Sequence, residues 1–301
     1  GGKIVLELQR LFGRMDVGSA VAVADTQDLV SLLGFDVSIQ QDPMECWRLL
    51  SASIEQAFAR DPALDGLFQR EFRGHQKHVT CCRACGMTSA REEVLDELQL
   101  NIKGNATVSE CLAQYEAVEE LSGESQYQCS SSECLGQKRD ATRWTVITRL
   151  PAVLWVQLLR YEFNKQTWDK VKLKDAVAVD EVLTHSPLGD APGGEAGGEA
   201  GAGGDVFDLV TVIEHRGVGA HNGHYVCRAR PWLLDRTKNG GTQGLSEAAS
   251  VAEGPAAQGW WLLDDAEVTK VNLPAKVAAK ERESKNGQSP NNAAEVVLME
   301  D

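Results

Sequence analysis

The sequence predicts an α+β protein, because helical patterns fill roughly its first sixty residues and strand patterns follow from about residue 76. The 301 residues are 43% hydrophobic and 25% charged, a balance typical of a globular chain that buries a core. This length suits two domains of about 150 residues each or one large multi-lobed domain. No apolar run approaches the roughly 18 residues that span a membrane.

Thirty lysines and arginines against forty-four aspartates and glutamates leave a net charge of −14. Such a surface repels phosphate, so neither nucleic acid nor an anionic membrane is expected as a partner, and a protein with a basic face is favoured. The eight cysteines are too sparse for a disulfide scaffold. Because Gly1 is preceded by no methionine or apolar leader, we expect a piece of a longer chain from a reducing compartment, cytoplasmic or nuclear.

Three helices are expected in the first sixty residues. Apolar residues at helical spacing mark the first one: Ile4, Leu8, Leu11 and Met15. Thr26 can cap a short second helix, which Gly34 would end. Asp42 opens the third, with Pro43 in its first turn and Glu45 completing a capping box. The apolar stripe of this third helix comprises Cys46, Leu49, Leu50, Ile54, Ala57 and Phe58.

Strands follow, interrupted by one helix. Leu98, Leu100 and Ile102 alternate with polar residues, as in a half-buried strand. Thr107 then opens a helix, with Glu110 as its capping partner. A continuous apolar run at 153–159 predicts a buried strand, and a further strand is expected to alternate through Phe207, Leu209, Thr211 and Ile213.

Three stretches carry no folding pattern. Residues 189–204 are rich in glycine and alanine, and residues 231–259 are rich in small and polar residues. Residues 276–292 are polar and without periodicity. We expect the first two to be flexible inserts and the third to be a polar tail, because none buries enough apolar surface to order itself.

Two cysteine pairs have the spacing of metal ligands. Cys82 and Cys85 are two residues apart, the gap by which a tight turn offers two thiolates to one tetrahedral zinc. Cys129 and Cys134 form a looser pair beyond the next strand–helix segment. The sequence therefore predicts a structural zinc site, against the alternative of free thiols. Cys81 remains a possible substitute ligand.

A histidine behind a glycine suggests acid–base chemistry. His224 follows Gly223 at the start of a predicted strand, where another backbone or a substrate can approach closely. With a carboxylate to orient its ring, such a histidine suits a general base. Asp264 or Asp265, at the end of the strand that begins at Trp260, could be the carboxylate that orients this ring. Taken alone, these residues could equally be ordinary surface groups.

These motifs, in this order, resemble the ubiquitin-specific proteases, papain-like cysteine peptidases that remove ubiquitin. The matching segments are Ile39-Gln40-Gln41-Asp42, the two cysteine pairs, Asn101-Ile102-Lys103-Gly104, Leu150-Pro151-x-Val153-Leu154, and His215-Arg216-Gly217-Val218 through Gly223-His224-Tyr225 to Leu263-Asp264-Asp265. Pro43 and Cys46 stand where the family usually has alanine and phenylalanine.

The resemblance implies a fold of fingers, palm and thumb that grips ubiquitin. A partial, helical thumb would cover residues 1–75, and β-rich fingers with the zinc site would cover 76–145. The palm would cover 146–275, and a polar tail at 276–301 would contain a possible last palm strand. The resemblance also implies His224 as general base, with Asp264 rather than Asp265 orienting it. Ubiquitin and ubiquitinated proteins are the implied partners.

The nucleophile of the family is missing from these residues. It lies in a Gly-x-x-Asn-x-x-x-x-Cys box, which this sequence lacks, and Cys46 is expected to be a small core residue on its helix. We therefore expect an N-terminally truncated thiol-dependent deubiquitinase that is inactive alone. The alternatives are a non-catalytic ubiquitin-binding module and a zinc-stapled scaffold in which His224 and Asp264 are relics.

Overall fold

A computed structural model describes residues 2–17, 24–36, 41–166, 168–173, 175–186, 204–217, 223–230, 259–271 and 294–300. It confirms the α+β prediction. The three stretches predicted to be unfolded lie outside these ranges, apart from Gly204 and Gly259 at their edges. No helix in the described part of the chain is both long and apolar enough to cross a membrane.

Helices α1 (Gly2–Val17), α2 (Gln27–Leu33) and α3 (Pro43–Phe58) form where the sequence predicted them, and α4 (Leu67–Phe72) follows. The Asp42 carboxylate caps α3 by accepting hydrogen bonds from the backbone N–H groups of Met44 (2.7 Å) and Glu45 (3.3 Å). Gly34 ends α2 with a positive φ of 79°. Thr26 stands at the start of α2, but its side chain makes no capping hydrogen bond.

The predicted apolar stripe of α3 is partly wrong. Leu49 is 42% exposed, whereas Met44 is fully buried. Trp47 anchors the helix, because its ring stacks on Trp155 at 4.4 Å between centroids and lies 5.4 Å from Phe72. The other five residues of the predicted stripe are half-buried, and α3 packs against α1, α2 and α4. Met15 of α1 is also exposed.

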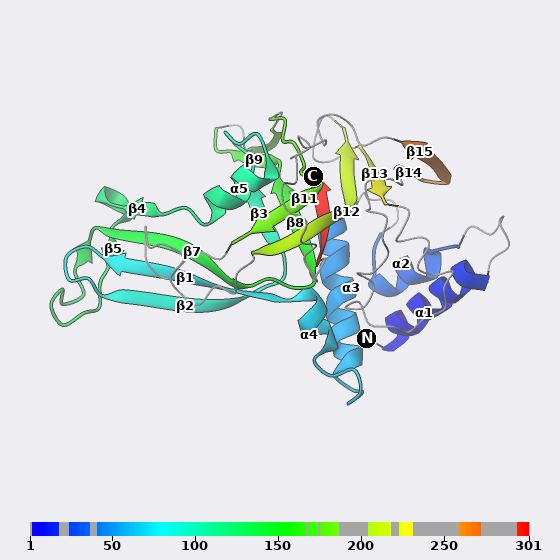
Figure 1. The fold of residues 1–301 in the computed structure, drawn as a ribbon, viewed down its shortest axis with the longest axis horizontal. Coiled ribbons are helices and arrows are strands. Elements are labelled where there is room, and N and C mark those ends of the chain that lie inside the picture. The colour runs from blue at the N-terminus through cyan, green and yellow to red at the C-terminus, as the bar shows by residue number, and fades with distance from the viewer. Residues whose placement is uncertain are drawn as a thin grey trace, which may run out of the picture.

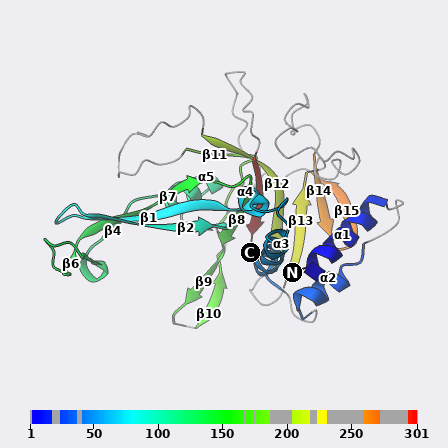
Figure 2. The ribbon, with the colours of Figure 1, turned by 90° about the horizontal axis from the view of Figure 1, so that it is seen from below.

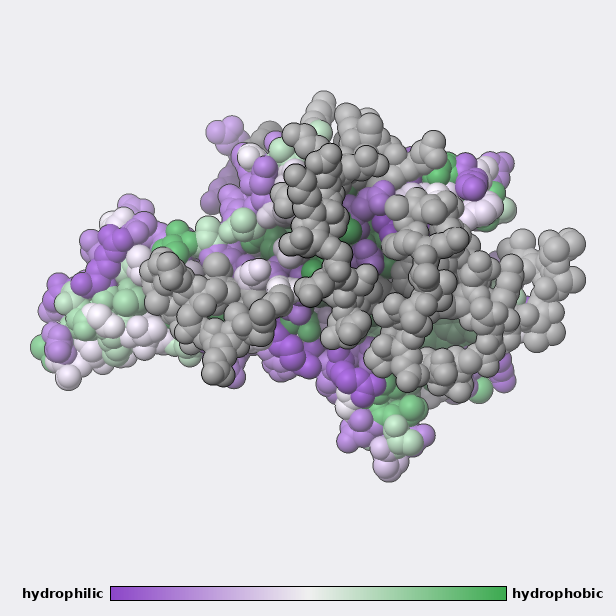
Figure 3. Space-filling view, in the orientation of Figure 1, coloured by the Kyte–Doolittle hydropathy of each residue, from purple (hydrophilic) through white to green (hydrophobic). Residues whose placement is uncertain are grey.

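The first sheet, which we call the extended sheet, has strand order β2-β1-β7-β4. Its strands are β1 (Gly74–Cys82), β2 (Thr88–Leu95), β4 (Glu119–Leu121) and β7 (Ala141–Arg149). Figure 1 shows it reaching away from the rest of the molecule, with α1 and α2 at the opposite end. On the face drawn in Figure 3, hydrophilic residues are interspersed with smaller hydrophobic areas along this sheet. The short strands β5 (Tyr127–Gln128) and β6 (Lys138–Arg139) pair near its far end.

The second sheet, which we call the large sheet, has strand order β15-β14-β13-β12-β16-β8-β3, with β11 also pairing with β12. Its strands are β3 (Leu98–Asn101), β8 (Val153–Leu159), β11 (Val182–His185), β12 (Asp205–Arg216), β13 (His224–Ala229), β14 (Trp260–Asp264), β15 (Glu267–Val271) and β16 (Ala294–Glu300). Strand β16 lies between β8 and β12, parallel to both.

The main core lies where this sheet meets helix α5 (Val108–Tyr115). Its most deeply buried members are at most 1% exposed: Leu98, Leu100, Ile102, Cys111, Ile147, Leu154, Val156, Leu158, Phe207, Leu209 and Val212. The predicted cap of α5 is confirmed, because the Thr107 hydroxyl accepts a hydrogen bond from the Glu110 N–H at 3.1 Å. The predicted strands at 98–102 and 153–159 are likewise present.

Strand β12 departs from its predicted alternation. Its pairing with β16 shifts register between Leu209 and Thr211, which marks a β-bulge. Val210 and Val212 are therefore buried after the bulge, while Thr211 and Ile213, which we expected to point inward, are only half-buried. One extra residue exchanges the two faces of a strand.

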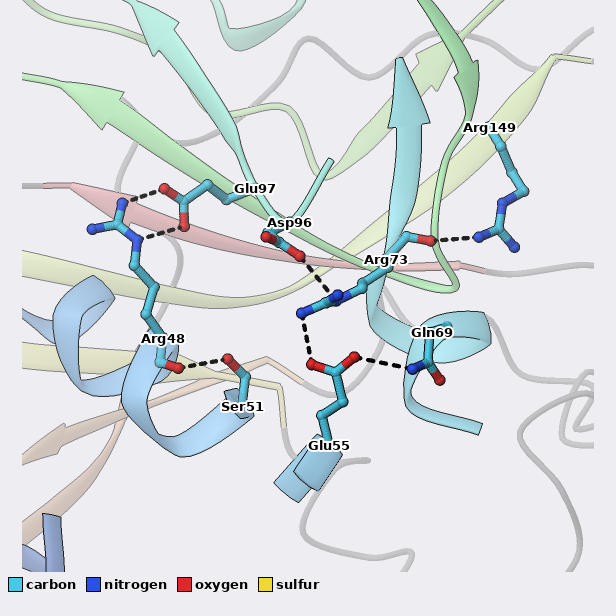
Figure 4. Close-up of polar contacts among 8 residues, drawn as sticks. All are labelled: Arg48, Ser51, Glu55, Gln69, Arg73, Asp96, Glu97 and Arg149. Atoms are coloured by element: carbon cyan, nitrogen blue, oxygen red, sulfur yellow. Dashed lines mark hydrogen bonds and ion pairs between the residues drawn. The ribbon is translucent and has the colours of Figure 1, made fainter. Parts of the chain in front are cut away.

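A hairpin of β9 (Tyr161–Asn164) and β10 (Asp169–Lys172) projects from the large sheet (Figure 2). A charged junction joins α3, α4 and the two sheets (Figure 4). The Arg73 guanidinium contacts Glu55 at 2.8 Å and Asp96 at 3.1 Å. Arg48 of α3 pairs with Glu97 beside it. The junction ties the helices to the place where the two sheets meet.

Candidate functional site

The candidate site lies at one end of three adjacent strands of the large sheet. Arg216 ends β12, His224 begins β13, and Asp264 ends β14. Arg216 and His224 are directly opposite partners in the antiparallel β12–β13 pair, so their side chains share one face. His215 and Tyr225, the next pair along, lie on the other face. The topology thus brings together residues that are 40 positions apart in the sequence.

The structure places the predicted base beside the predicted acid. His224 Nε2 lies 2.6 Å from Asp264 Oδ1, a short charge-assisted hydrogen bond in which the ring nitrogen donates. Among the described residues nothing hydrogen-bonds to His224 Nδ1. A ring held by a carboxylate at Nε2 offers Nδ1 as the nitrogen that can take a proton.

The structure also distinguishes between the two candidate acids, Asp264 and Asp265. Asp265 Oδ2 lies 3.9 Å from His224 Nε2, and the Asp265 side chain is 83% exposed. Asp265 has a positive φ of 51°, because it stands in the tight turn between β14 and β15. Asp264 is therefore the carboxylate that is hydrogen-bonded to the ring in this geometry.

Gly223 is packed against His215 on the opposite face of the sheet. A Cβ atom on Gly223 would lie 2.2 Å from His215 Nε2 and 2.8 Å from the Arg216 carbonyl oxygen. This close approach is the reason that a glycine precedes His224, as its position at a strand start suggested.

His215 is buried and held from the β9–β10 hairpin. Its Nδ1 lies 3.0 Å from Lys172 Nζ and 3.2 Å from the Tyr161 hydroxyl, both of which can donate to it. Lys172 Nζ also donates to the carbonyl oxygens of His215 (3.0 Å) and Gly217 (3.4 Å). Burial, and then the positive charge of Lys172, lower the pKa of His215, so its ring is a neutral acceptor. Sequence reasoning missed this support, because nothing in the spacing connects β10 with β12.

No cysteine of this sequence is placed to act as a nucleophile for His224. All eight lie in described ranges, and none hydrogen-bonds to the His224 ring. Burial raises the pKa of Cys46, and it raises the pKa of Cys227 to about 11, so both remain protonated thiols. Cys46 is half-buried on α3 and is therefore less buried than the core position expected of it.

The four predicted metal ligands do come together at the far end of the extended sheet. The sulfur atoms of Cys82, Cys85, Cys129 and Cys134 all lie within 4.8 Å of one another. The Cys85–Cys129 and Cys82–Cys134 sulfur separations are 3.6 Å and 3.9 Å. Four sulfur atoms around a zinc ion at about 2.3 Å would be about 3.8 Å apart. The donor set could therefore hold such a metal. Cys81 lies outside this cluster.

The backbone of this cluster has the tight turns that metal-binding cysteine pairs need. The Gly86 N–H donates to the Cys82 carbonyl oxygen at 2.8 Å, and Gly86 has a φ of 68°. The Gln137 N–H donates to the Cys134 carbonyl oxygen at 3.0 Å, around a Gly136 with a φ of 73°. A hydrogen bond from Ser131, followed by one from the Met87 backbone, lowers the pKa of Cys85 to about 6, which favours the thiolate.

Comparison with known proteins finds a matching family and similar relatives. Residues 2–295 match the family model described as ubiquitin carboxyl-terminal hydrolase. Ubiquitin carboxyl-terminal hydrolase 48 of Danio rerio is 33% identical over 225 residues, which cover 74% of this chain and 20% of that protein. Ubiquitin carboxyl-terminal hydrolase 26 of Oryza sativa subsp. japonica is 30% identical over 295 residues, covering 94% of this chain and 24% of that protein.

A solved structure of the SAGA Ubp8/Sgf11/Sus1/Sgf73 DUB module bound to ubiquitin aldehyde has the same fold. It matches with a TM-score of 0.59 and 20% identity, over 82% of this chain and 47% of that chain. This chain thus spans about a fifth to a quarter of the two hydrolase relatives and about half of that structure's chain. The match of the family model across nearly the whole sequence shows that this chain belongs to the ubiquitin carboxyl-terminal hydrolase family.

Proposed function

We propose that this chain is part of a thiol-dependent deubiquitinase and supplies its general base and orienting acid. The observation that carries the proposal is the hydrogen bond of 2.6 Å between Asp264 and His224 Nε2, which leaves Nδ1 available, on the fold of this family. The nucleophilic thiol would come from residues outside this sequence. Ubiquitin and ubiquitinated proteins would be the partners, in the cytoplasm or nucleus.

The reaction divides into two acyl-transfer steps. In the first, His224 Nδ1 takes the proton of the thiol, and the thiolate attacks the carbonyl carbon at the ubiquitin C-terminus. His224 then gives this proton to the leaving lysine amine, and a thioester remains. In the second step His224 removes a proton from water, whose oxygen attacks the thioester and releases ubiquitin and the thiol. Asp264 holds the ring and stabilises its charged form throughout.

The parts of the fold suit a division into thumb, fingers and palm. We assign the helices within residues 1–75 to a partial thumb, the extended sheet within 76–145 to the fingers, and the large sheet within 146–275 to the palm. Strand β16 within 276–301 would complete the palm sheet. Cys82, Cys85, Cys129 and Cys134 would hold a structural zinc that joins the two ends of the fingers.

The test is hydrolysis of a ubiquitin C-terminal amide by the natural full-length protein that contains this chain. We expect His224→Ala to abolish turnover and Asp264→Asn to lower kcat/KM by about 10²–10⁴-fold. Asp265→Asn is the matched control, because Asp265 is adjacent in sequence yet largely exposed, and it should change kcat/KM by less than about threefold. Equal losses in the two aspartate variants would reject the assignment of Asp264.

A non-catalytic ubiquitin-binding module is the second candidate, favoured by the lack of a cysteine bonded to His224 among these residues. It predicts that the full-length protein has no hydrolytic activity but still binds ubiquitin, and that His224→Ala leaves binding unchanged. A protein that neither cleaves nor binds ubiquitin would be a zinc-stapled scaffold. Calorimetric titration of the same protein with ubiquitin separates these outcomes.

A further inference from the structure

We propose that Arg216 is a positioning residue that holds Asp264 in the orientation in which Asp264 orients His224. The role in catalysis rests on the proposed function, whereas the hydrogen-bonded chain of Arg216, Asp264 and His224 does not. Arg216 ends β12, Asp264 ends β14, and the strand that carries His224 lies between them.

The two oxygen atoms of the Asp264 carboxylate have different partners. His224 Nε2 donates to Oδ1 at 2.6 Å, and Arg216 Nη1 donates to Oδ2 at 3.2 Å. The terminal torsion of an aspartate is soft, so a carboxylate bonded through only one oxygen can rotate about its axis. A second hydrogen bond to the other oxygen removes this freedom and fixes the plane of the carboxylate.

The position of Arg216 follows from the strand register. Arg216 and His224 are directly opposite partners, so the arginine side chain begins beside the histidine on the same face. An arginine is long enough to pass β13 and reach the next strand, and its planar guanidinium keeps its charge at any physiological pH. The same residue is thus beside the base and bonded to the acid.

The stability of the fold does not explain this ion pair. The side chains of Arg216 and Asp264 are 44% and 33% exposed, and an exposed pair of this kind contributes little to the free energy of unfolding. Asp265, 3.9 Å from the same imidazole nitrogen, is a competing carboxylate that has no bond to Arg216 among the described contacts. Arg216 therefore selects which of the two adjacent aspartates is held against the ring.

The first test uses the 301-residue chain and needs no catalysis. Long-range 1H–15N spectra of the chain labelled at histidine, taken well above the ordinary imidazole pKa, report which ring nitrogen carries the proton. We expect His224 to carry it on Nε2, and Arg216→Met to convert this signal into a mixture of both forms. Arg216→Lys should restore part of it, because it keeps a donor and a charge.

Lys270→Met is the matched control for charge. Lys270 lies on β15, beside the strand of Asp264, is exposed, and forms no ion pair with Asp264. It should leave the His224 signal unchanged. An unchanged signal in Arg216→Met, or equal changes in the two variants, would overturn the proposal whether or not the protein is an enzyme.

The second test is a double-mutant cycle in the full-length protein. Arg216→Met should lower kcat/KM for a ubiquitin C-terminal amide about tenfold, as expected for one charged hydrogen bond. In an Asp264→Asn background the same change should have no further effect, because the group that Arg216 positions is already altered. An equal tenfold loss in both backgrounds would assign Arg216 to folding or substrate binding instead. If the natural protein has no turnover, the proposed function fails, and the spectra alone decide the role of Arg216.

Discussion

Among the glycines in the described part of the chain, Gly223 has the least room for a side chain, since a Cβ there would lie 2.2 Å from His215. We expect Gly223→Ala to displace the start of β13, to destabilise the fold by about 1–3 kcal/mol, and to lower ubiquitin hydrolysis by moving His224. Gly13→Ala in α1 is the control, because a Cβ at Gly13 would meet nothing within 4 Å. This substitution should stabilise the helix by about 0.5–1 kcal/mol. Urea unfolding measures both. Equal stabilities of the two variants would contradict the close approach.

His215 makes the stability of the fold depend on pH. Its pKa is lowered below the ordinary value of 6.5, so the folded state favours the neutral ring, which faces Lys172, Tyr161 and Tyr225. This contribution is fully present above about pH 6.5 and is lost as the pH falls from there through the lowered pKa. We expect the free energy of unfolding to fall over this window, and to fall less in His215→Gln. Urea titrations at several pH values test this, and identical slopes would contradict it.

The sequence predicted some site residues because short motifs carry them, and it missed others because tertiary contacts place them. Gly223 and His224 are adjacent, and Asp264 ends a recognisable strand, so local pattern was enough. Lys172 reaches His215 from a hairpin that pairs only with itself in the described sheets. Arg216 belongs to a quoted motif, but its bond to Asp264 depends on the order of three strands.

At the scale of elements, the cysteine cluster closes the far end of the extended sheet, so removal of zinc should loosen it. We expect one zinc per chain, and expect chelation or Cys129→Ser to lower the melting temperature. The accompanying loss in the free energy of unfolding should be smaller than the roughly 10–16 kcal/mol that zinc binding contributes in isolated zinc fingers. The reason is that the sheet has a core of its own around Val79, Trp144 and Val146. Cys81→Ser, next to the cluster but outside it, is the control and should retain the metal. Metal analysis and thermal unfolding measure these outcomes. A metal-free protein whose melting is indifferent to chelators would exclude the site.

Element positions followed from the sequence more reliably than element faces did. Caps at Asp42 and Thr107 marked true helix starts, because a cap is a local hydrogen bond. The predicted buried faces of α3 and β12 were each partly wrong, for different reasons. In α3, Leu49 is exposed and Trp47 packs on Trp155 and Phe72, and in β12 a bulge shifts the pattern by one residue. Neither the packing of α3 nor the bulge in β12 can be predicted from the residues of the segment alone.

At the scale of the whole molecule, Trp47 joins the helical part to the large sheet by stacking on Trp155. We expect Trp47→Ala to destabilise the protein by about 3 kcal/mol, because it removes a large ring from between two elements. Leu49→Ala, on the same helix but 42% exposed, should cost less than about 1 kcal/mol. Urea unfolding followed by circular dichroism compares them. A small effect of the tryptophan change would mean that other contacts hold the helix.

The position of β16 in the centre of the large sheet has a consequence for folding during synthesis on the ribosome. Its residue Glu295 pairs with Val153, so 142 positions of chain must be synthesised before this contact can form. Until then β8 and β12 each present an unpaired edge, and such edges are templates for joining with other chains. Assembly of the sheet is therefore a late and slow event, dominated by distant contacts. Nascent chains of this protein should depend on chaperones until β16 inserts.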